Sequence, residues 1–258
     1  MKPRVCILRT AGTNCDKETA FAFEAAGGDP ELVHVNRLIS SEKSLDNYHI
    51  LVLPGGFSYG DDIAAGKILA NELRCKLNQG LKRFIAAGKL IIGICNGFQI
   101  LVKSGLLPGN DTLEQETSLI INDCGSFLDE WVYLKVTRSQ SHKSQVKCVW
   151  AKDLPEEIYL PIAHGEGKFV VRDKQVLARL KKNNQIVFKY SDNPNGSLED
   201  IAGICDDTGR ILGLMPHPER HIDIRQHPRW EKTSGASLGH GFLIIKNGVE
   251  YAKNNLRG

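Results

Sequence analysis

The fold is decided by residues 90–101, Leu90-Ile91-Ile92-Gly93-Ile94-Cys95-Asn96-Gly97-Phe98-Gln99-Ile100-Leu101. The run begins with apolar residues typical of a buried strand. It ends with apolar residues that can line one face of a helix. Between them, Gly-x-Cys-x-Gly has the spacing of a nucleophile elbow, with cysteine in the place of serine. The sequence therefore predicts a strand, a sharp turn that carries Cys95, and a helix.

The turn at Cys95 has a chemical consequence. Gly93 and Gly97 carry no Cβ atom, so the strand and the helix can approach each other closely. A cysteine at a helix N-terminus meets unpaired N–H groups and the positive end of the helix dipole, which favour its thiolate. A free thiol has a pKa of about 8.5 and is mostly protonated at neutral pH, so this stabilisation of the thiolate matters. The motif by itself is equally compatible with a buried structural cysteine.

The composition places the chain among ordinary globular proteins. It has 258 residues, of which 41% are hydrophobic and 24% charged. We therefore expect one α/β domain over residues 1–258, with a sizeable core. The net charge of +3 is small and the basic residues are dispersed. Neither nucleic acid nor a membrane surface is favoured as a partner.

The seven cysteines lie far apart in the sequence and form no CxxC pair, so no metal site is expected. The first residues, Met1-Lys2-Pro3-Arg4, lead directly into a strand-like segment, unlike a signal peptide. No apolar run is long enough to span a bilayer. These features predict a cytoplasmic protein with reduced thiols.

Strands and helices alternate in the first half of the chain. Strands are predicted over residues 5–8, 32–35, 50–53 and 90–94, and helices over residues 16–26, 63–77 and 80–87. The alternation predicts right-handed crossovers and a doubly wound, flavodoxin-like fold, with a mainly parallel central sheet and flanking helices. Ligands in such sheets bind at the carboxyl ends of strands. Both Cys95 and Pro54-Gly55-Gly56 fall at such ends.

The second half is richer in strands. They are predicted over residues 130–136, 145–150, 159–163 and 186–190, with helices over 173–182 and 240–254. Strands at 201–205 and 211–215 flank Asp206-Asp207-Thr208-Gly209, which is a hairpin signal. We expect this late hairpin to be an excursion from the main sheet.

Pro216-His217-Pro218-Glu219 follows the last of these strands. The prolines favour extended backbone, in which residues two apart face the same side. His217 and Glu219 can therefore project together, as an imidazole oriented by a carboxylate. Because the preceding strand should end on the same edge as Cys95, the sequence predicts a nucleophile, a base and an orienting group. The alternative is a proline-rich turn with two solvated side chains.

Pro54-Gly55-Gly56-Phe57-Ser58-Tyr59-Gly60-Asp61 follows the predicted strand at 50–53. Two glycines at a strand end allow backbone N–H groups to turn toward an oxyanion. The N–H of Asn96, directly after the nucleophile, is the usual second donor in an elbow. A plain Gly-Gly turn is the alternative interpretation.

Together, the Cys95 elbow and the Pro-His-Pro-Glu segment resemble the class I (triad) glutamine amidotransferase family. Other segments narrow the resemblance to the glutaminase subunits of phosphoribosylformylglycinamidine synthases of purine biosynthesis. These are residues 54–62, 122–127, 131–136, 161–167 and 218–220. The likeness runs from Val5 to the last predicted helix. It is weaker at residues 109–119, 139–145 and 193–200.

The resemblance implies a reaction and roles for three residues. Cys95 would be the nucleophile, His217 the general base and acid, and Glu219 the carboxylate that orients His217. L-glutamine would be hydrolysed to glutamate and ammonia, and the ammonia would pass to a synthetase.

The resemblance also implies residues that bind the substrate. Gly56 and Asn96 would donate the oxyanion-hole N–H groups, although the choice among Gly55, Gly56 and Phe57 stays open. Gln99 would bind polar groups of the substrate, and Gly55 and Phe57 would line the pocket. His164 and Glu166 match a family motif without an assigned role.

The chain has no Gly-x-x-x-x-Gly-Lys-[Ser/Thr] phosphate loop and no Gly-x-Gly-x-x-Gly fingerprint. No cofactor is expected on it. The resemblance places ATP and magnesium on a large partner synthetase subunit, often joined by a small bridging subunit. The alternatives are the amidotransferase subunit of another synthetase, another cysteine hydrolase of this fold, or an inactive regulatory module. The presence of Cys95, His217 and Glu219 disfavours the last of these.

Overall fold

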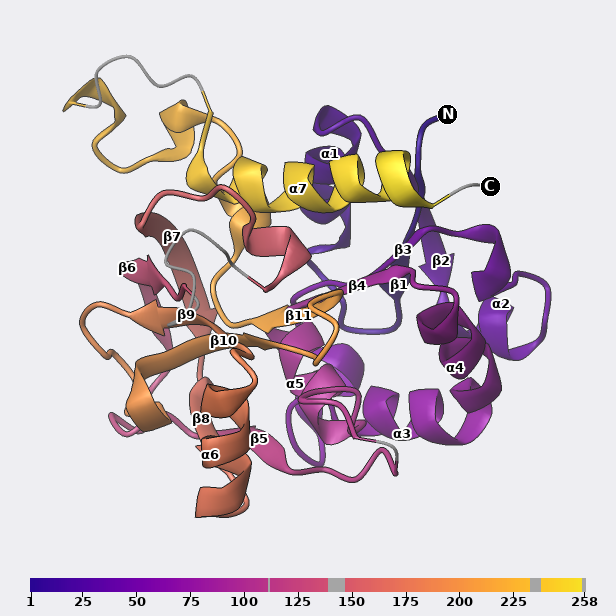
Figure 1. The fold of residues 1–258 in the computed structure, drawn as a ribbon, viewed down its shortest axis with the longest axis horizontal. Helices are drawn as coiled ribbons and strands as arrows, with labels where there is room; N and C mark the ends of the chain where they lie inside the picture. The colour runs from indigo at the N-terminus through magenta and orange to yellow at the C-terminus, as the bar shows by residue number, and fades with distance from the viewer. Residues whose placement is uncertain (111, 139–146, 233–237, 257–258) are drawn as a thin grey trace.

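The computed structural model describes residues 1–110, 112–138, 147–232 and 238–256. These residues form a large sheet with helices on both faces (Figure 1). The strands are β1 Arg4–Arg9, β2 Asp29–His34, β3 Ile50–Leu53, β4 Leu90–Ile94, β5 Thr117–Ile120, β6 Leu128–Val136, β7 Glu157–His164, β8 Lys168–Val171, β9 Ile186–Tyr190, β10 Ile201–Cys205 and β11 Ile211–Leu214. The helices are α1 Asp16–Ala25, α2 Val35–Ile39, α3 Lys67–Lys76, α4 Asn78–Ala86, α5 Asn96–Lys103, α6 Lys174–Lys182 and α7 His240–Asn255.

The main sheet has nine strands in the order β2-β1-β3-β4-β11-β10-β9-β6-β7. The strands from β2 to β11 pair in parallel. From β11 onward, the pairs with β10, β9, β6 and β7 are antiparallel. The α/β fold class is confirmed, with the parallel strands carrying Cys95 and the glycine-rich loop at their carboxyl ends.

The predicted hairpin is present, but it is not an excursion from the sheet. Its second strand, β11, pairs in parallel with β4, with Leu214 opposite Ile94. All residues of β10 and β11 are buried. Strands that are apolar on both faces are stable only where helices cover both faces, which is the middle of such a sheet. This placement puts the segment after β11 beside Cys95.

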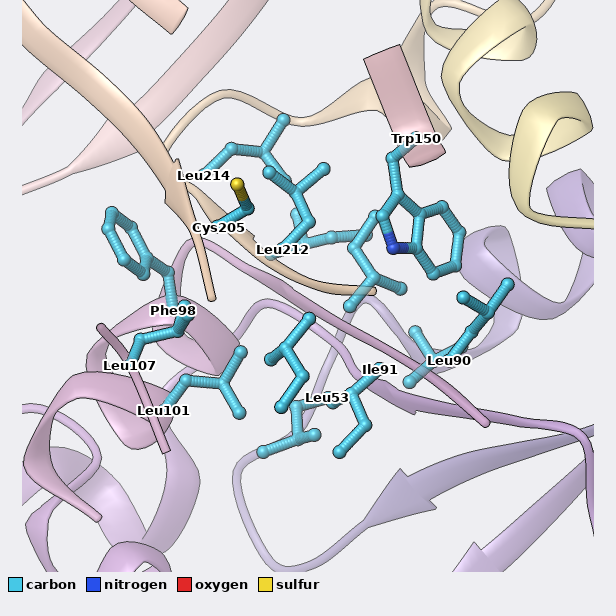
Figure 2. Close-up of a cluster of buried hydrophobic side chains, with 14 of the residues drawn as sticks. Leu53, Leu90, Ile91, Phe98, Leu101, Leu107, Trp150, Cys205, Leu212 and Leu214 are labelled. Atoms are coloured by element: carbon cyan, nitrogen blue, oxygen red, sulfur yellow. The ribbon is translucent and has the colours of Figure 1, made fainter. Parts of the chain in front are cut away.

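Helices α1 and α7 lie on one side of the sheet, and α3, α4 and α5 lie on the other (Figure 1). Figure 2 shows the core where β4 and β11 meet these layers: Phe98 and Leu101 from α5 lie toward one side, and Trp150 lies toward the other. Each of these three side chains is fully buried. Burying a leucine or phenylalanine side chain contributes about 1.5–3 kcal/mol, so this core holds the elbow helix firmly on its strand.

Two predicted elements differ from the structure. Within the described residues, the strand predicted over 145–150 is replaced by a short 3-10 turn, Val149–Ala151; residues 145 and 146 lie outside the described part. The turn lets Trp150 bury its ring while its indole N–H donates to the Arg210 carbonyl at 3.0 Å. The helix predicted from residue 63 begins only at Lys67, because Gly66 adopts a left-handed φ of 71°.

Helix α1 begins at Asp16, as predicted, and Cys15 occupies its N-cap position. Asp16 lies in the first turn, and its carboxylate pairs with Arg9 at 3.0 Å. Among the helices of the described part, none is both long and apolar enough to cross a bilayer.

Candidate active site

The elbow forms as the spacing of its glycines predicts. Cys95 links β4 to α5 with φ 51° and ψ −107°, a strained conformation for a residue with a side chain. A Cβ atom on Gly97 would lie 1.9 Å from the Leu53 carbonyl oxygen, and one on Gly93 would lie 2.5 Å from the Gly97 carbonyl oxygen. The Cys95 N–H donates to the Leu214 carbonyl at 2.8 Å. Neighbouring strands thus hold Cys95 in its turn.

Gly97→Ala is expected to destabilise the protein by about 1–3 kcal/mol, because the added methyl group forces the elbow helix away from β3. Urea unfolding measures the change. Gly80→Ala is the matched control, since its Cβ atom would approach no other atom closer than 3.8 Å. Equal stability of the two variants would show that the close packing at Gly97 does not constrain the turn.

His217 and Glu219 lie at the same edge of the sheet as Cys95. Both side chains are 2% exposed or less. His217 Nδ1 contacts Glu219 Oε1 at 2.7 Å. The His217 backbone N–H donates to the Pro161 carbonyl at 2.8 Å, which ties this segment to β7. The structure therefore brings together the imidazole and the carboxylate that the Pro-His-Pro-Glu spacing predicted.

The surroundings of His217 favour its protonated form. Burial acts to lower the pKa of His217, but the Glu219 carboxylate and the nearby Cys95 and Cys15 thiols outweigh it, and the pKa lies well above its usual value. Glu219 holds Nδ1 as a donor, whereas His217 Nε2 has no hydrogen-bond partner among the described residues. The arrangement suits an imidazolium paired with a thiolate.

The glycine-rich loop is held by the loop between β1 and α1. The Phe57 N–H donates to the Gly12 carbonyl at 2.9 Å, and the Cys15 N–H donates to the Gly55 carbonyl at 3.3 Å. Gly56 has a φ of 139°, a conformation that favours glycine. Because the Phe57 N–H is already engaged, Gly55 and Gly56 remain the candidate oxyanion donors of this loop.

Gly55 and Phe57 have different neighbours in the structure. A Cβ atom on Gly55 would lie 2.8 Å from His217 Cε1, so the glycine allows the imidazole to pack against the loop. The Phe57 side chain is 48% exposed, and its ring centroid lies 6.4 Å from that of Phe127. The predicted roles of Gly55 and Phe57 as pocket-lining residues stay predictions.

Asn96 and Gln99 form a hydrogen-bonded network. Asn96 Oδ1 accepts from the Ser58 N–H at 3.2 Å, and Asn96 Nδ2 donates to Gln99 Oε1 at 2.9 Å. Gln99 Nε2 donates to the Glu166 carbonyl at 2.7 Å. The amide of Gln99 thus connects the elbow helix to the turn after β7. Substrate binding by Gln99, and an oxyanion contact from the Asn96 N–H, stay predictions.

His164 is the last residue of β7, and Glu166 lies on that turn. His164 is 3% exposed, and neither ring nitrogen has a hydrogen-bond partner among the described residues. Burial, together with the charge of His217, lowers the pKa of His164 to about 4, so it is neutral at pH 7. Asn122 supports the turn, because its amide donates to the His164 carbonyl at 2.8 Å and accepts from the Gly167 N–H at 2.9 Å. Glu166 lies 3.8 Å from the ammonium of Lys103.

Sequence analysis missed Cys15 and Arg220 as members of this site. Arg220 Nη2 donates to Cys15 Sγ at 3.2 Å, and Arg220 Nε donates to Glu18 at 2.9 Å. Burial raises the pKa of the Cys15 thiol, an effect that His217 and Arg220 partly oppose. One signal was available: Cys15 follows the first strand, and the carboxyl ends of parallel strands meet at one edge.

A family model described as a CobB/CobQ-like glutamine amidotransferase domain matches residues 2–252. The chain belongs to this family of glutamine amidotransferases. Two curated relatives are named phosphoribosylformylglycinamidine synthase subunit PurQ. The one from Dehalococcoides mccartyi is 45% identical, over 98% of each chain. The one from Treponema denticola is 42% identical, over 97% of this chain and 99% of the relative.

Two solved structures are similar to this chain. A chain from the structure of PurLQS from Thermotoga maritima matches with a TM-score of 0.75 and 32% identity, over 100% of each chain. A glutamine amidotransferase from the same organism matches with a TM-score of 0.53 and 17% identity, over 98% of this chain and 93% of that one. At that identity, the second match supports the fold alone. The predicted family and fold class are confirmed.

Proposed function

We propose that Cys95, His217 and Glu219 form a catalytic triad that hydrolyses the side-chain amide of L-glutamine. One observation carries this assignment. The strained elbow at Cys95 and the buried His217–Glu219 pair, joined at 2.7 Å, lie at one edge of the sheet, on the adjacent strands β4 and β11. A nucleophile, a base and a group that orients the base are the parts that such a hydrolysis requires.

The reaction has two halves. The Cys95 thiolate attacks the amide carbon of glutamine, and the imidazolium of His217 gives a proton to the departing nitrogen. Ammonia leaves, and a glutamyl thioester remains on Cys95. His217 then takes a proton from water, which attacks the thioester and releases glutamate and the thiol. Glu219 keeps Nδ1 protonated and the ring oriented throughout.

The tetrahedral intermediates carry negative charge on the former carbonyl oxygen. The Asn96 N–H lies in the first turn of α5, where a backbone N–H group has no partner within the helix. We assign the second donor to Gly56, with Gly55 as the alternative. Each aligned donor lowers the barrier by roughly 3 kcal/mol.

This hydrolysis belongs to purine biosynthesis. The chain is the glutaminase subunit of a phosphoribosylformylglycinamidine synthase, because it is a glutamine amidotransferase and its relatives are named as a subunit of that synthase. Ammonia passes to a large synthetase subunit, which converts formylglycinamide ribonucleotide to formylglycinamidine ribonucleotide, and a small bridging subunit completes the complex. We place ATP and magnesium on the synthetase, and the complex in the cytoplasm.

The isolated chain is expected to be a poor glutaminase, because free hydrolysis would waste glutamine. The synthetase would complete the pocket by moving the loop at Gly55-Gly56 or the turn at His164–Gly167. Loss of one oxyanion donor slows hydrolysis about a hundredfold or more, so a small backbone rotation suffices. Glutamate release is measured for the chain alone and then with the synthetase, ATP and formylglycinamide ribonucleotide.

A rate increase of about a hundredfold on adding the synthetase would support both the function and the gating. Equal rates in the two assays would show that the oxyanion site is already formed without the partner. Absence of glutamate release in both assays would exclude the proposed hydrolysis and favour an inactive regulatory module.

A further inference from the structure

One face of helix α5 is polar, although the whole helix is buried. Asn96, Gln99 and Lys103 are separated by three and four residues, so their side chains lie on the same side of the helix. The three residues are only 2%, 3% and 5% exposed. Burial of polar side chains is unfavourable unless each of them is paired, so the partners of this polar face indicate its purpose. The proposed reaction gives no role to Lys103.

The polar face contacts the glycine-rich segment, which we define as residues 54–66. Asn96 Nδ2 donates to Asp61 Oδ1 at 3.1 Å. The ammonium of Lys103 donates to the Ala65 carbonyl at 2.5 Å, in a buried hydrogen bond. Two separate residues of the glycine-rich segment are therefore attached to the helix that follows Cys95.

The same polar face contacts the turn after β7. Gln99 Nε2 donates to the Glu166 carbonyl at 2.7 Å, and the Lys103 ammonium lies 3.8 Å from the Glu166 carboxylate. The end of β7, from which the turn continues, lies beside Cys95, because Cys95 Sγ is 3.6 Å from the Ala163 carbonyl oxygen. Lys103 thus contacts both the turn and the glycine-rich segment with one ammonium group.

The charge of Lys103 links the two segments in energy as well as in space. Burial lowers the pKa of Lys103, and the carboxylates of Glu166 and Asp61 oppose this effect. One of these carboxylates belongs to the turn and the other to the glycine-rich segment. A buried cation is strongly destabilising when its partners are removed. Displacing either segment therefore changes the free energy of displacing the other.

We propose that Lys103 is a positioning residue of the glutaminase, which joins the turn after β7 to the glycine-rich segment so that both keep their places around Cys95. Lys103 acts through Ala65 and Glu166 and not on the reacting atoms. The two segments that could gate the oxyanion site then move together, so a synthetase that displaces one of them also displaces the other. This effect on the reaction rests on the proposed function, whereas the coupling of the two segments does not.

The coupling is measured by residue-resolved amide hydrogen exchange of the full-length chain. The Gly66 N–H reports on the glycine-rich segment, since it donates to Asp61 Oδ1 at 2.9 Å. The Gly167 N–H reports on the turn, since it donates to Asn122 Oδ1 at 2.9 Å. Exchange at both reporter amides is compared with exchange in the buried strand β1, which separates local loosening from a change in global stability.

Three variants are compared with the unmodified chain. Lys103→Met keeps the length of the side chain and removes its charge and its donors. Glu166→Gln removes the carboxylate and keeps the backbone carbonyl that Gln99 contacts. Lys246→Met is the matched control, because the Lys246 side chain is 44% exposed and pairs with Glu250 of the same helix at 3.5 Å.

We expect Lys103→Met to speed exchange at both reporter amides by about tenfold or more, the effect of losing a hydrogen bond to a charged group. Glu166→Gln should speed exchange at Gly66 as well as at Gly167, although Glu166 belongs to the turn and Gly66 to the other segment. Lys246→Met should leave exchange at both reporter amides unchanged.

The effect on the reaction is measured in the complex with the synthetase. Lys103→Met should lower kcat/KM for glutamine by about tenfold, and amination from added ammonia should not change. Because Lys103 acts in part through Glu166, the double variant Lys103→Met/Glu166→Gln should lose no more activity than Lys103→Met. Lys246→Met should keep the activity of the unmodified complex.

Faster exchange at only one of the two reporter amides in Lys103→Met would overturn the proposal, because the segments would then move independently. Unchanged exchange at Gly66 in Glu166→Gln would overturn it even if Lys103→Met does not fold. A double variant whose loss of activity equals the product of the two single losses would also overturn it, since the two side chains would act separately. Coupled exchange in a chain that does not hydrolyse glutamine would refute the proposed function and leave the coupling standing.

Discussion

Replacing Cys95 by alanine is expected to lower glutamine-dependent activity by at least about four orders of magnitude and to leave the fold intact. The reason is that no other described residue occupies the strained position between β4 and α5, where the thiol meets the N-terminus of the helix. Amination from added ammonia should persist in Cys95→Ala assembled with its synthetase, because we place the ATP-dependent site on the other chain. Assays with glutamine and with ammonia as nitrogen donor measure the two activities.

The control is chemical labelling of the unmodified chain with an electrophilic glutamine analogue. Cys6 and Cys205 are buried. Burial raises the pKa of Cys6, and contact with Cys148 together with burial raises the pKa of Cys205. Peptide mapping should therefore find the label on Cys95. A label chiefly on Cys6 or Cys205, with loss of activity, would remove Cys95 from the role of nucleophile.

His217→Ala is expected to be about as damaging as Cys95→Ala, and Glu219→Ala less so. The imidazole moves a proton in both halves of the reaction, whereas the carboxylate orients the imidazole and stabilises its charge. Single-turnover and steady-state glutamate release in the complex measure the three variants. The assignment of roles would be wrong if Glu219→Ala were the most severely impaired.

The pH profile of activity distinguishes the effect of the Glu219 charge on His217 from the orienting of the imidazole by Glu219. The Glu219 carboxylate helps to raise the pKa of His217. Because the active form pairs a thiolate with an imidazolium, activity should fall as the pH rises through the pKa of His217. Glu219→Gln keeps a hydrogen-bonding side chain but removes the charge, so this basic limb should move to lower pH. An unmoved limb would show that the charge of Glu219 does not set the protonation of His217.

Much of the parallel half of the fold is predictable from local pattern. The strands at β1, β3 and β4 are short apolar runs whose bounds depend on a few neighbouring residues. The helix predicted over residues 173–182 is α6, and Asp173 caps it, since its side chain accepts from the N–H groups of Gln175 and Val176. The secondary-structure predictions are wrong where tertiary contacts compete with local preference, as at the turn that buries Trp150.

In the candidate site, too, contacts between neighbouring residues are predictable from the sequence and contacts between distant residues are not. The pairing of His217 with Glu219 follows from two prolines and a separation of two residues, and the structure has it at 2.7 Å. Substrate binding by Gln99 stays a prediction, and only the structure shows that the amide of Gln99 donates to the Glu166 carbonyl. Only the structure shows that the glycine-rich loop is held by backbone hydrogen bonds to Gly12 and Cys15. Such contacts join residues whose separation in the sequence carries no signal.

The sequence by itself determined the elbow at Cys95 and the partner of His217, because each depends on residues within a few positions of one another. It also determined the family, because each motif that carries the resemblance is a short contiguous segment. Only the tertiary structure decided that β11 lies in the middle of the sheet and that Cys15 lies beside the triad. The physical reason is that strand order is set by burial of both faces of the whole sheet. That burial is a property of all the strands and helices together, so no single segment encodes it.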